Sequence, residues 1–129
     1  MTCVLGVDPG DVRIGVAVSD PLGLIARPLE IIQHISHGED ATAILNLAHN
    51  YHAGEIVVGI PYGIEEEVGT QARKALHLVD ALREAGELKV HTWDESGSSQ
   101  RAGTLDSDKP IDALAAAVIL QEFLDAKNG

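Results

Sequence analysis

Apolar runs and tight turns alternate through the first third of the chain, which predicts three short strands. The apolar run Val4 to Asp8 ends at Pro9-Gly10, a strong turn signal. Arg13 to Ser19 carries apolar residues spaced by two, and Leu24 to Ile32 follows a second turn. Pro28 indicates that this third strand is irregular or lies at an edge. Because turns this short join antiparallel neighbours, the chain is expected to open as a β-meander.

The middle of the chain changes to helical spacing that alternates with continuous apolar runs. Glu39 to His52 and roughly Thr70 to Ala85 carry apolar residues three and four apart, which predicts two amphipathic helices. Ile56 to Ile60 and Leu88 to Trp93 are short apolar runs, as in strands that are covered on both faces. Each helix is expected to end at a glycine, and the two candidates are Gly54 and Gly86.

A polar stretch and a closing helix complete the pattern. Ser96 to Lys109 is rich in serine and glycine and is interpreted as a loop with one short helical turn near Gln100. Pro110 suits the first position of a helix that runs to about Ala126. That helix is apolar nearly all round apart from Asp112, so it is expected to be buried.

These elements predict one α/β domain over residues 1–129, since neither an internal repeat nor a linker divides the sequence. The expected architecture is a mixed five-stranded sheet, with a three-strand antiparallel meander followed by parallel strands, flanked by helices. A lone cysteine, Cys3, excludes an internal disulfide and indicates a reducing compartment. With neither a leader pattern nor an apolar run near the roughly 18 residues of a membrane span, a cytoplasmic protein is expected.

The charge balance runs against a general nucleic-acid-binding surface. Nine basic and twenty acidic residues give a formal charge of -11, whereas counterion release from phosphates requires basic contacts. A local basic patch would require the scattered basic residues to gather in space, and these are Arg13, Arg27, Arg73, Lys74, Arg83 and Arg101.

Three acidic residues stand at positions where a sheet of this kind binds ligands. Asp8 ends the first strand and Glu95 follows the last one, and ligand sites lie at the carboxyl ends of parallel strands. Asp112 lies on an otherwise apolar helix, where a carboxylate needs a partner. Taken singly, Asp8 fits a turn former and Glu95 a solvated corner. Together they fit a divalent cation, since two carboxylates at about 4 Å repel by roughly 4 kcal/mol at an effective dielectric near 20.

Other candidate sites fit structural roles better. His49 and His52 have a spacing that can bind zinc, but an exposed helix face explains them more simply. Glu65 to Glu67 are interpreted as the solvated tip of a loop. The early glycines do not form a dinucleotide-binding motif, because no helix follows their turn.

Several stretches resemble the YqgF/RuvX family of Holliday junction resolvases. The most specific is Leu-Gly-Val-Asp-Pro-Gly-Asp-Val-Arg-Ile-Gly-Val-Ala-Val-Ser-Asp-Pro-Leu-Gly-Leu-Ile-Ala-Arg-Pro-Leu-Glu at residues 5–30. Ile-Val-Val-Gly-Ile-Pro at 56–61, Gly69 with its helix, and Trp-Asp-Glu at 93–95 follow in the expected order. Ile-Asp-Ala-Leu-Ala-Ala-Ala-Val-Ile-Leu-Gln at 111–121 is similar to the closing helix of the family. The resemblance covers nearly the whole chain.

The resemblance implies a ribonuclease H-like fold and a divalent-metal nuclease. Asp8, Glu95 and Asp112 match the family's catalytic acids and would hold Mg²⁺ or Mn²⁺, with Asp8 between two ions and water as the attacking group. The implied partners are branched DNA or structured precursor RNA, including the precursor of the small-subunit ribosomal RNA. Arg13 and Arg101 are the basic residues expected to contact substrate, and a homodimer is left open.

The chain also departs from the family pattern. Ser96 to Ser99 replaces the usual Arg-Leu-Thr-Thr, and only Arg101 and Lys109 remain of the usual basic cluster before the last helix. Tyr62 to Glu67 replaces the usual Leu-Asn-Met-Asp-Gly run. These changes leave a second reading open, a catalytically weak or inactive nucleic-acid-binding or ribosome-assembly module of the same fold. A third, a sugar kinase or actin-like ATPase, would need two such domains.

Overall fold

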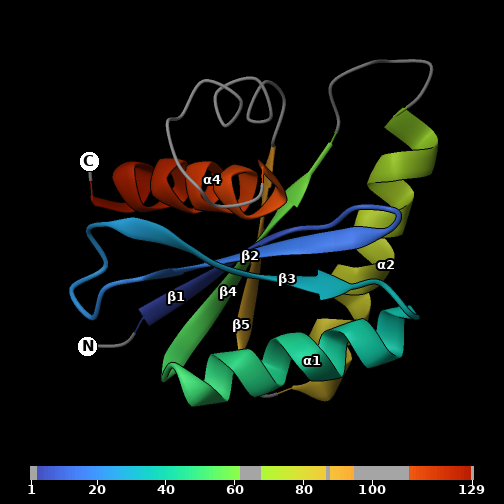
Figure 1. Cartoon of the computed structure of the whole chain (residues 1–129), viewed down its shortest axis with the longest axis horizontal. Helices are drawn as coiled ribbons and strands as arrows, with labels where there is room; N and C mark the ends of the chain where they lie inside the picture. The colour runs from blue at the N-terminus through green and yellow to red at the C-terminus, as the bar shows by residue number, and fades with distance from the viewer. Residues whose placement is uncertain (1–2, 62–67, 87, 95–110, 129) are drawn as a thin grey trace.

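A computed structural model describes residues 3–61, 68–86, 88–94 and 111–128 of the chain. Its strands form one five-stranded sheet in the order β3-β2-β1-β4-β5. In chain order the elements are β1 (Cys3–Asp8), β2 (Arg13–Ser19), β3 (Ala26–Gln33), α1 (His37–Asn50), β4 (Ala53–Ile60), α2 (Val68–Ala85), β5 (Lys89–Asp94) and α4 (Ile111–Asn128). The expected sheet of five strands is therefore confirmed (Figure 1).

Strand direction in the sheet follows the predicted pattern. β1, β2 and β3 are antiparallel neighbours, whereas β4 is parallel to both β1 and β5. The register places Val7 beside Val58, and Ile60 beside Asp94. Strands β1, β4 and β5 therefore end at the same side of the sheet, which we call the carboxyl edge.

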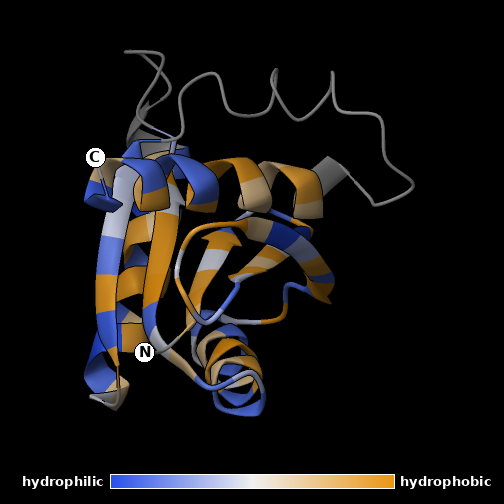
Figure 2. Ribbon diagram, turned by 90° about the vertical axis from the view of Figure 1, so that its left-hand side faces the viewer, coloured by the Kyte–Doolittle hydropathy of each residue, from blue (hydrophilic) through white to orange (hydrophobic). Residues whose placement is uncertain are grey.

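Helices cover both faces of the sheet (Figure 1). Leu5 and Val7 of β1 point to α1 and α2, whose buried residues belong to the larger core cluster. Val4 and Val57 point to the opposite face, where they pack with Ala116, Leu120 and other residues of α4. Apolar strands thus lie between layers of helix (Figure 2).

The end of α1 differs from the sequence prediction. Ser36 caps the start of the helix by accepting a hydrogen bond from the Glu39 backbone at 3.2 Å, as serine commonly does. The helix ends at Asn50, and the turn that follows uses His52 at a φ of 58°. Gly54, expected to end the helix, lies inside β4 instead. Gly86, with a φ of 70°, does follow the last residue of α2 as predicted.

The start of β3 also differs from its predicted position. The run beginning at Leu24 was expected to be strand, but β3 begins at Ala26. The carboxylate of Asp20 accepts hydrogen bonds from the backbone amides of Leu24 and Ile25 at 2.7 and 3.0 Å. These bonds hold both residues in the turn, and they lower the pKa of Asp20 from its usual value.

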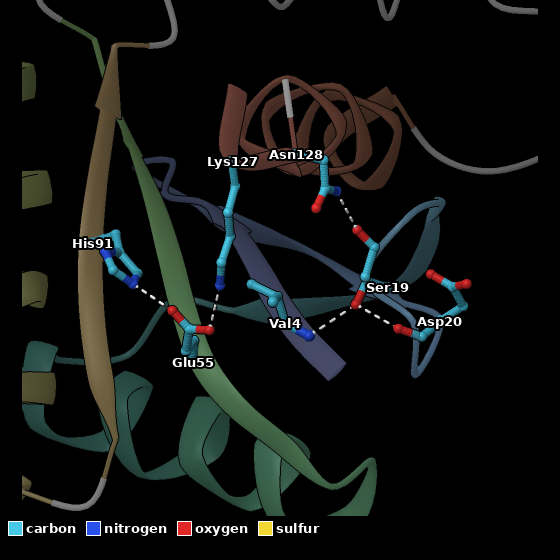
Figure 3. A network of polar contacts seen from close by, with 8 residues as sticks. Val4, Ser19, Asp20, Glu55, His91, Lys127 and Asn128 are labelled. Atoms are coloured by element: carbon cyan, nitrogen blue, oxygen red, sulfur yellow. Dashed lines mark hydrogen bonds and ion pairs between the residues drawn. The ribbon is translucent and has the colours of Figure 1, made fainter. Parts of the chain in front are cut away.

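Polar contacts fix the C-terminal half of α4 to the sheet (Figure 3). Lys127 donates to Glu55 of β4 at 2.7 Å, and His91 of β5 bonds the other carboxylate oxygen at 2.7 Å. Gln121 accepts a hydrogen bond from the Ala26 backbone at 2.9 Å. The last turns of α4 therefore lie at the side of the sheet opposite the carboxyl edge.

Among the described elements, none is a helix with the length and apolarity needed to cross a membrane.

Candidate active site

Asp8, the first of the predicted metal ligands, is the last residue of β1 in the centre of the sheet. Residues two apart on a strand share a face, so Asp8 lies on the same face as Val4 and Gly6. That face is covered by α4, because a Cβ added to Gly6 would lie 2.7 Å from the Leu120 Cβ. The half-buried Asp8 side chain therefore belongs to the α4 side of the carboxyl edge.

The backbone of Asp112 lies in the first turn of α4. Gly6 faces the helix at Ala116, whose backbone oxygen would lie 3.1 Å from an added Cβ. From Gly6 to Asp8 the strand advances by about 6.6 Å toward the carboxyl edge. From Ala116 back to Asp112 the helix covers about 6 Å in the same direction. The Asp8 and Asp112 backbones are therefore at the same end of the interface between β1 and α4.

Glu95 and Arg101, two further predicted site residues, lie outside the described residues. β5 is described up to Asp94, which pairs with Ile60 at the carboxyl edge. The remaining predicted site residue, Arg13, begins β2 as an exposed residue and lies at the same edge of the sheet. The structure thus describes Asp8, Arg13 and the backbone of the first turn of α4 at this end of the sheet.

A zinc site at His49 and His52 does not fit the structure. His49 belongs to the last turn of α1, whereas His52 lies beyond the helix in a left-handed conformation. The two side chains therefore do not share a helix face. Over the described ranges, which leave out Glu95 and the Asp112 side chain, no group of three or more histidine, cysteine or acidic residues is placed to hold a metal ion.

The described members of the scattered basic group do not gather into one patch. Arg27 lies at the start of β3, at the end of the sheet opposite the carboxyl edge where Asp8 lies. Arg83 lies near the end of α2 and donates to the backbone oxygen of Val90 at 2.8 Å. Arg13 lies at the carboxyl edge, and Lys74 donates at 3.0 Å to Asp11 in the hairpin that follows Asp8.

A cavity of about 160 Å³, which the sequence did not predict, opens on the other side of this hairpin. Pro9, Gly10 and Asp11 form one wall, and His34, His37 and Lys74 are among the other lining residues. His34 follows β3 and His37 begins α1. Only the fold brings these residues together, because nothing in the local sequence pattern links positions 11, 34, 37 and 74.

Hydrogen bonds hold the polar groups of this cavity in place. Asp11 accepts from Gln71 at 3.1 Å and from Lys74 at 3.0 Å. These two partners lower the pKa of Asp11 from its usual value, so it is a carboxylate at neutral pH. Asp40, only 2% exposed, accepts from the Ile35 backbone at 2.9 Å and also bonds Nδ1 of His34.

Comparison with known proteins identifies the family of the chain. The family model RuvX, described as Holliday junction resolvase, matches residues 2–126. The chain belongs to the RuvX family. A protein of Desulforamulus reducens named "Putative pre-16S rRNA nuclease" is 36% identical over 132 residues, with 95% of this chain and 96% of the relative covered. A relative of the same name from Thermoanaerobacter pseudethanolicus is 34% identical, with 97% of each chain covered.

Solved structures show the same fold for this RuvX member. The RuvC protein of T. thermophilus, determined in complex with a Holliday junction substrate, superimposes with a TM-score of 0.67. It is 20% identical and the match covers 98% of this chain and 96% of RuvC. The ribonuclease H-like fold implied by the sequence resemblance is therefore confirmed, and the chain is a member of a nuclease family.

Proposed function

We propose that this RuvX protein is a divalent-metal-dependent nuclease that hydrolyses phosphodiester bonds in structured or precursor RNA, with branched DNA as the competing substrate. One observation carries the proposal. Asp8 ends the central strand on the face covered by α4, and the first turn of α4, which contains Asp112, lies at the same end of that interface.

Asp8, Glu95 and Asp112 are the residues that would hold the metal. Their carboxylate oxygens are the ligands preferred by Mg²⁺ and Mn²⁺, so the donor chemistry fits these ions. When bound, such ions neutralise charge on the phosphodiester and lower the pKa of water. The protein's own part is to present Asp8 from a rigid central strand and to offer Arg13 and Arg101 to substrate phosphates.

The names of the relatives support the choice of RNA as first substrate. Two relatives with at least 34% identity are named for the precursor of the 16S ribosomal RNA. The RuvC structure, at 20% identity, was determined with a Holliday junction. We therefore propose that the chain trims the small-subunit ribosomal RNA precursor, and we treat a branched DNA junction as the alternative to be measured beside it.

We expect Asp8→Asn to lower Mn²⁺- and Mg²⁺-dependent cleavage by about two to three orders of magnitude while the protein stays folded. The amide keeps the size of the side chain but removes the charge that would bind the ion. Loss of one group that stabilises transition-state charge typically costs about two to three orders of magnitude in rate. Cleavage of a structured precursor RNA and of a branched DNA junction, measured in parallel with circular dichroism, tests this expectation.

Asp80→Asn is the matched control, because Asp80 is an exposed residue of α2 and the change in charge is the same. It should cleave like the wild type. Crystals soaked in Mn²⁺ give a second test, since an ion bound by Asp8, Glu95 and Asp112 would produce an anomalous peak. A fully soaked crystal without such a peak would overturn the mechanism.

A binding module without catalysis is the second candidate function. The net charge of -11 and the serine-rich sequence at residues 96–99 favour it over a general nuclease. Equal binding of substrate by the wild type and Asp8→Asn, with no cleavage by either in Mg²⁺ or Mn²⁺, would support this candidate and contradict the nuclease.

A further inference from the structure

The cavity beside the β1–β2 hairpin lies close to the proposed reaction centre but on the other side of the hairpin. Asp8 and Asp11 are separated by three peptide units, so their Cα atoms are at most about 11 Å apart. Asp8 faces α4, whereas the cavity reaches Ile14 and Leu78 in the core beneath α1 and α2. A nucleic-acid strand that crosses the carboxyl edge could therefore occupy both places.

The lining of the cavity suits a flat aromatic ligand. Ile14, Ala75 and Leu78 are each at most 2% exposed and contribute its apolar part. His34 and His37 add two imidazole rings whose centroids are 5.9 Å apart. Unpaired bases stack on histidine rings and form hydrogen bonds along their polar edges. A nucleobase has two apolar faces that can pack on this lining, and a polar edge that can form hydrogen bonds with its charged groups.

The charges in the cavity do not suit a phosphate. Asp11 and Asp40 both line it, and Asp40 is almost fully buried. Lys74 is the lysine in the lining, and Asp11, paired with it at 3.0 Å, balances its positive charge but leaves it N–H groups to donate. A phosphate would meet two carboxylates at close range, which is unfavourable. The base of a nucleotide fits the cavity better than its phosphate.

Asp11 and Lys74 together present a pattern that matches guanine. A carboxylate has about four acceptor positions, and Gln71 and Lys74 use one on each oxygen of Asp11. Guanine alone among the common bases offers two adjacent donors, N1–H and N2–H, to the remaining positions. Its neighbouring O6 accepts, which suits the ammonium group of Lys74. Adenine and cytosine would instead turn an acceptor nitrogen toward the carboxylate.

We propose that this cavity binds an unpaired guanine of the substrate strand close to the bond that is cut. Asp11 reads the two donors of the base, Lys74 donates to O6, and His37 stacks on the ring. The proposal rests on the proposed nuclease function for the identity of the ligand. The protein is therefore expected to prefer a strand that has an unpaired guanine near the cleavage position.

Binding can be tested on the full chain without metal and without cleavage. Histidine ring signals are followed by NMR while guanosine monophosphate, adenosine monophosphate or inorganic phosphate is added. We expect His34 and His37 signals to shift with guanosine monophosphate at a concentration about tenfold lower than with adenosine monophosphate, the size expected for one bidentate contact. Inorganic phosphate should leave both signals unchanged.

Two pairs of variants connect the effect to the cavity. Asp11→Asn should remove the preference for guanine, whereas Asp80→Asn removes an equal charge from a residue of α2 outside the lining and should retain it. His37→Ala should weaken binding of both nucleotides about tenfold, in the range measured for loss of one stacking contact. His37→Phe keeps a ring and should restore binding.

Equal affinity for the two nucleotides, an unchanged preference in Asp11→Asn, or identical shifts with inorganic phosphate would overturn the proposal. Because no metal or cleavage enters this measurement, these outcomes leave the nuclease proposal intact. Conversely, a protein that binds guanosine monophosphate as expected but does not cleave would contradict the nuclease proposal only.

Discussion

At the residue scale, Gly6 controls how closely α4 approaches the sheet. A Cβ at this position would lie 2.7 Å from the Leu120 Cβ and 3.1 Å from the Ala116 backbone oxygen. Neither atom is the flexible end of a side chain, so the helix itself would have to move. The absence of a side chain at position 6 is therefore a packing requirement of the interface on which Asp8 and Asp112 lie.

We expect Gly6→Ala to lower the free energy of unfolding by about 1–3 kcal/mol, the usual cost of an overpacked core. It should also weaken Mn²⁺ binding, because a displaced α4 carries Asp112 away from Asp8. Chemical denaturation and metal titration measure the two effects. Gly38→Ala is the control, since that glycine lies in α1 with nothing within 4 Å of an added Cβ.

The control should change stability in the opposite direction. Alanine favours a helix over glycine by about 1 kcal/mol, so Gly38→Ala is expected to be as stable as the wild type or more stable. A Gly6→Ala protein that matched the wild type in both stability and metal affinity would show that α4 can move at no cost.

Ser19 provides a second residue-scale test. Its side chain is 3% exposed, and its hydroxyl accepts a hydrogen bond from the Val4 backbone at 2.8 Å (Figure 3). The hydroxyl also donates to the Asp20 backbone oxygen at 2.9 Å. Ser19→Ala would leave the buried Val4 N–H without this acceptor. We expect a loss of about 1–3 kcal/mol in unfolding free energy, measured by urea denaturation; an unchanged midpoint and slope would contradict this account.

At the scale of elements, α4 depends on a carboxylate in a neighbouring strand. The hydrogen bond from Lys127 lowers the pKa of Glu55 from its usual value; burial opposes this shift, and the bond to His91 adds to it. A carboxyl group with a lowered pKa stabilises the fold above its unfolded pKa and loses that contribution as the pH falls through the folded value. The attachment of α4 should therefore weaken in acid.

We expect Glu55→Gln to lower the free energy of unfolding by about 1 kcal/mol at neutral pH, near the upper end for partly exposed pairs. The difference from the wild type should shrink as the pH falls below about 4.5, where the unfolded carboxyl group becomes protonated. Denaturation curves at several pH values measure it. Glu84→Gln removes a charge from an exposed residue of α2, and a pH profile identical to that of Glu55→Gln would rule out a specific role for Glu55.

The order of the elements was predictable, but several of their ends were not. Alternation and helical spacing indicated all five strands and the helices α1, α2 and α4. The ends depend on side-chain and long-range contacts. For example, the hydrogen bonds from Leu24 and Ile25 to the Asp20 carboxylate keep these residues in a turn, so β3 begins only at Ala26. Helical spacing on α2 predicts an apolar stripe of Ala72, Ala75, Leu76, Val79 and Leu82, but Leu76 is 36% exposed, whereas Leu78 is buried at 2%. Helical spacing alone does not decide which residues at the border of an apolar stripe are buried, because that depends on the elements packed against the helix.

At the scale of the whole molecule, sequence reasoning could propose the part of the candidate site that depends on strand ends. Asp8 could be singled out because β1 ends in a turn, and Asp112 because it is a carboxylate on an apolar helix. The cavity at Asp11, His34, His37 and Lys74 could not be predicted, since residues from the hairpin, the end of β3, α1 and α2 meet there only after folding.

The edge strand β3 also bears on how this acidic protein behaves at high concentration. β3 is an edge strand of the sheet. Its Pro28 has no backbone N–H to donate, and its pairing with β2 shifts register between Val16 and Ala17. An unbroken outer strand is a template for aggregation, and a proline or a bulge interrupts that template. Growth of fibrils or of a continuous intermolecular sheet is therefore hindered along β3. Pairing with a second copy of the chain through the backbone of β3 is hindered for the same reason.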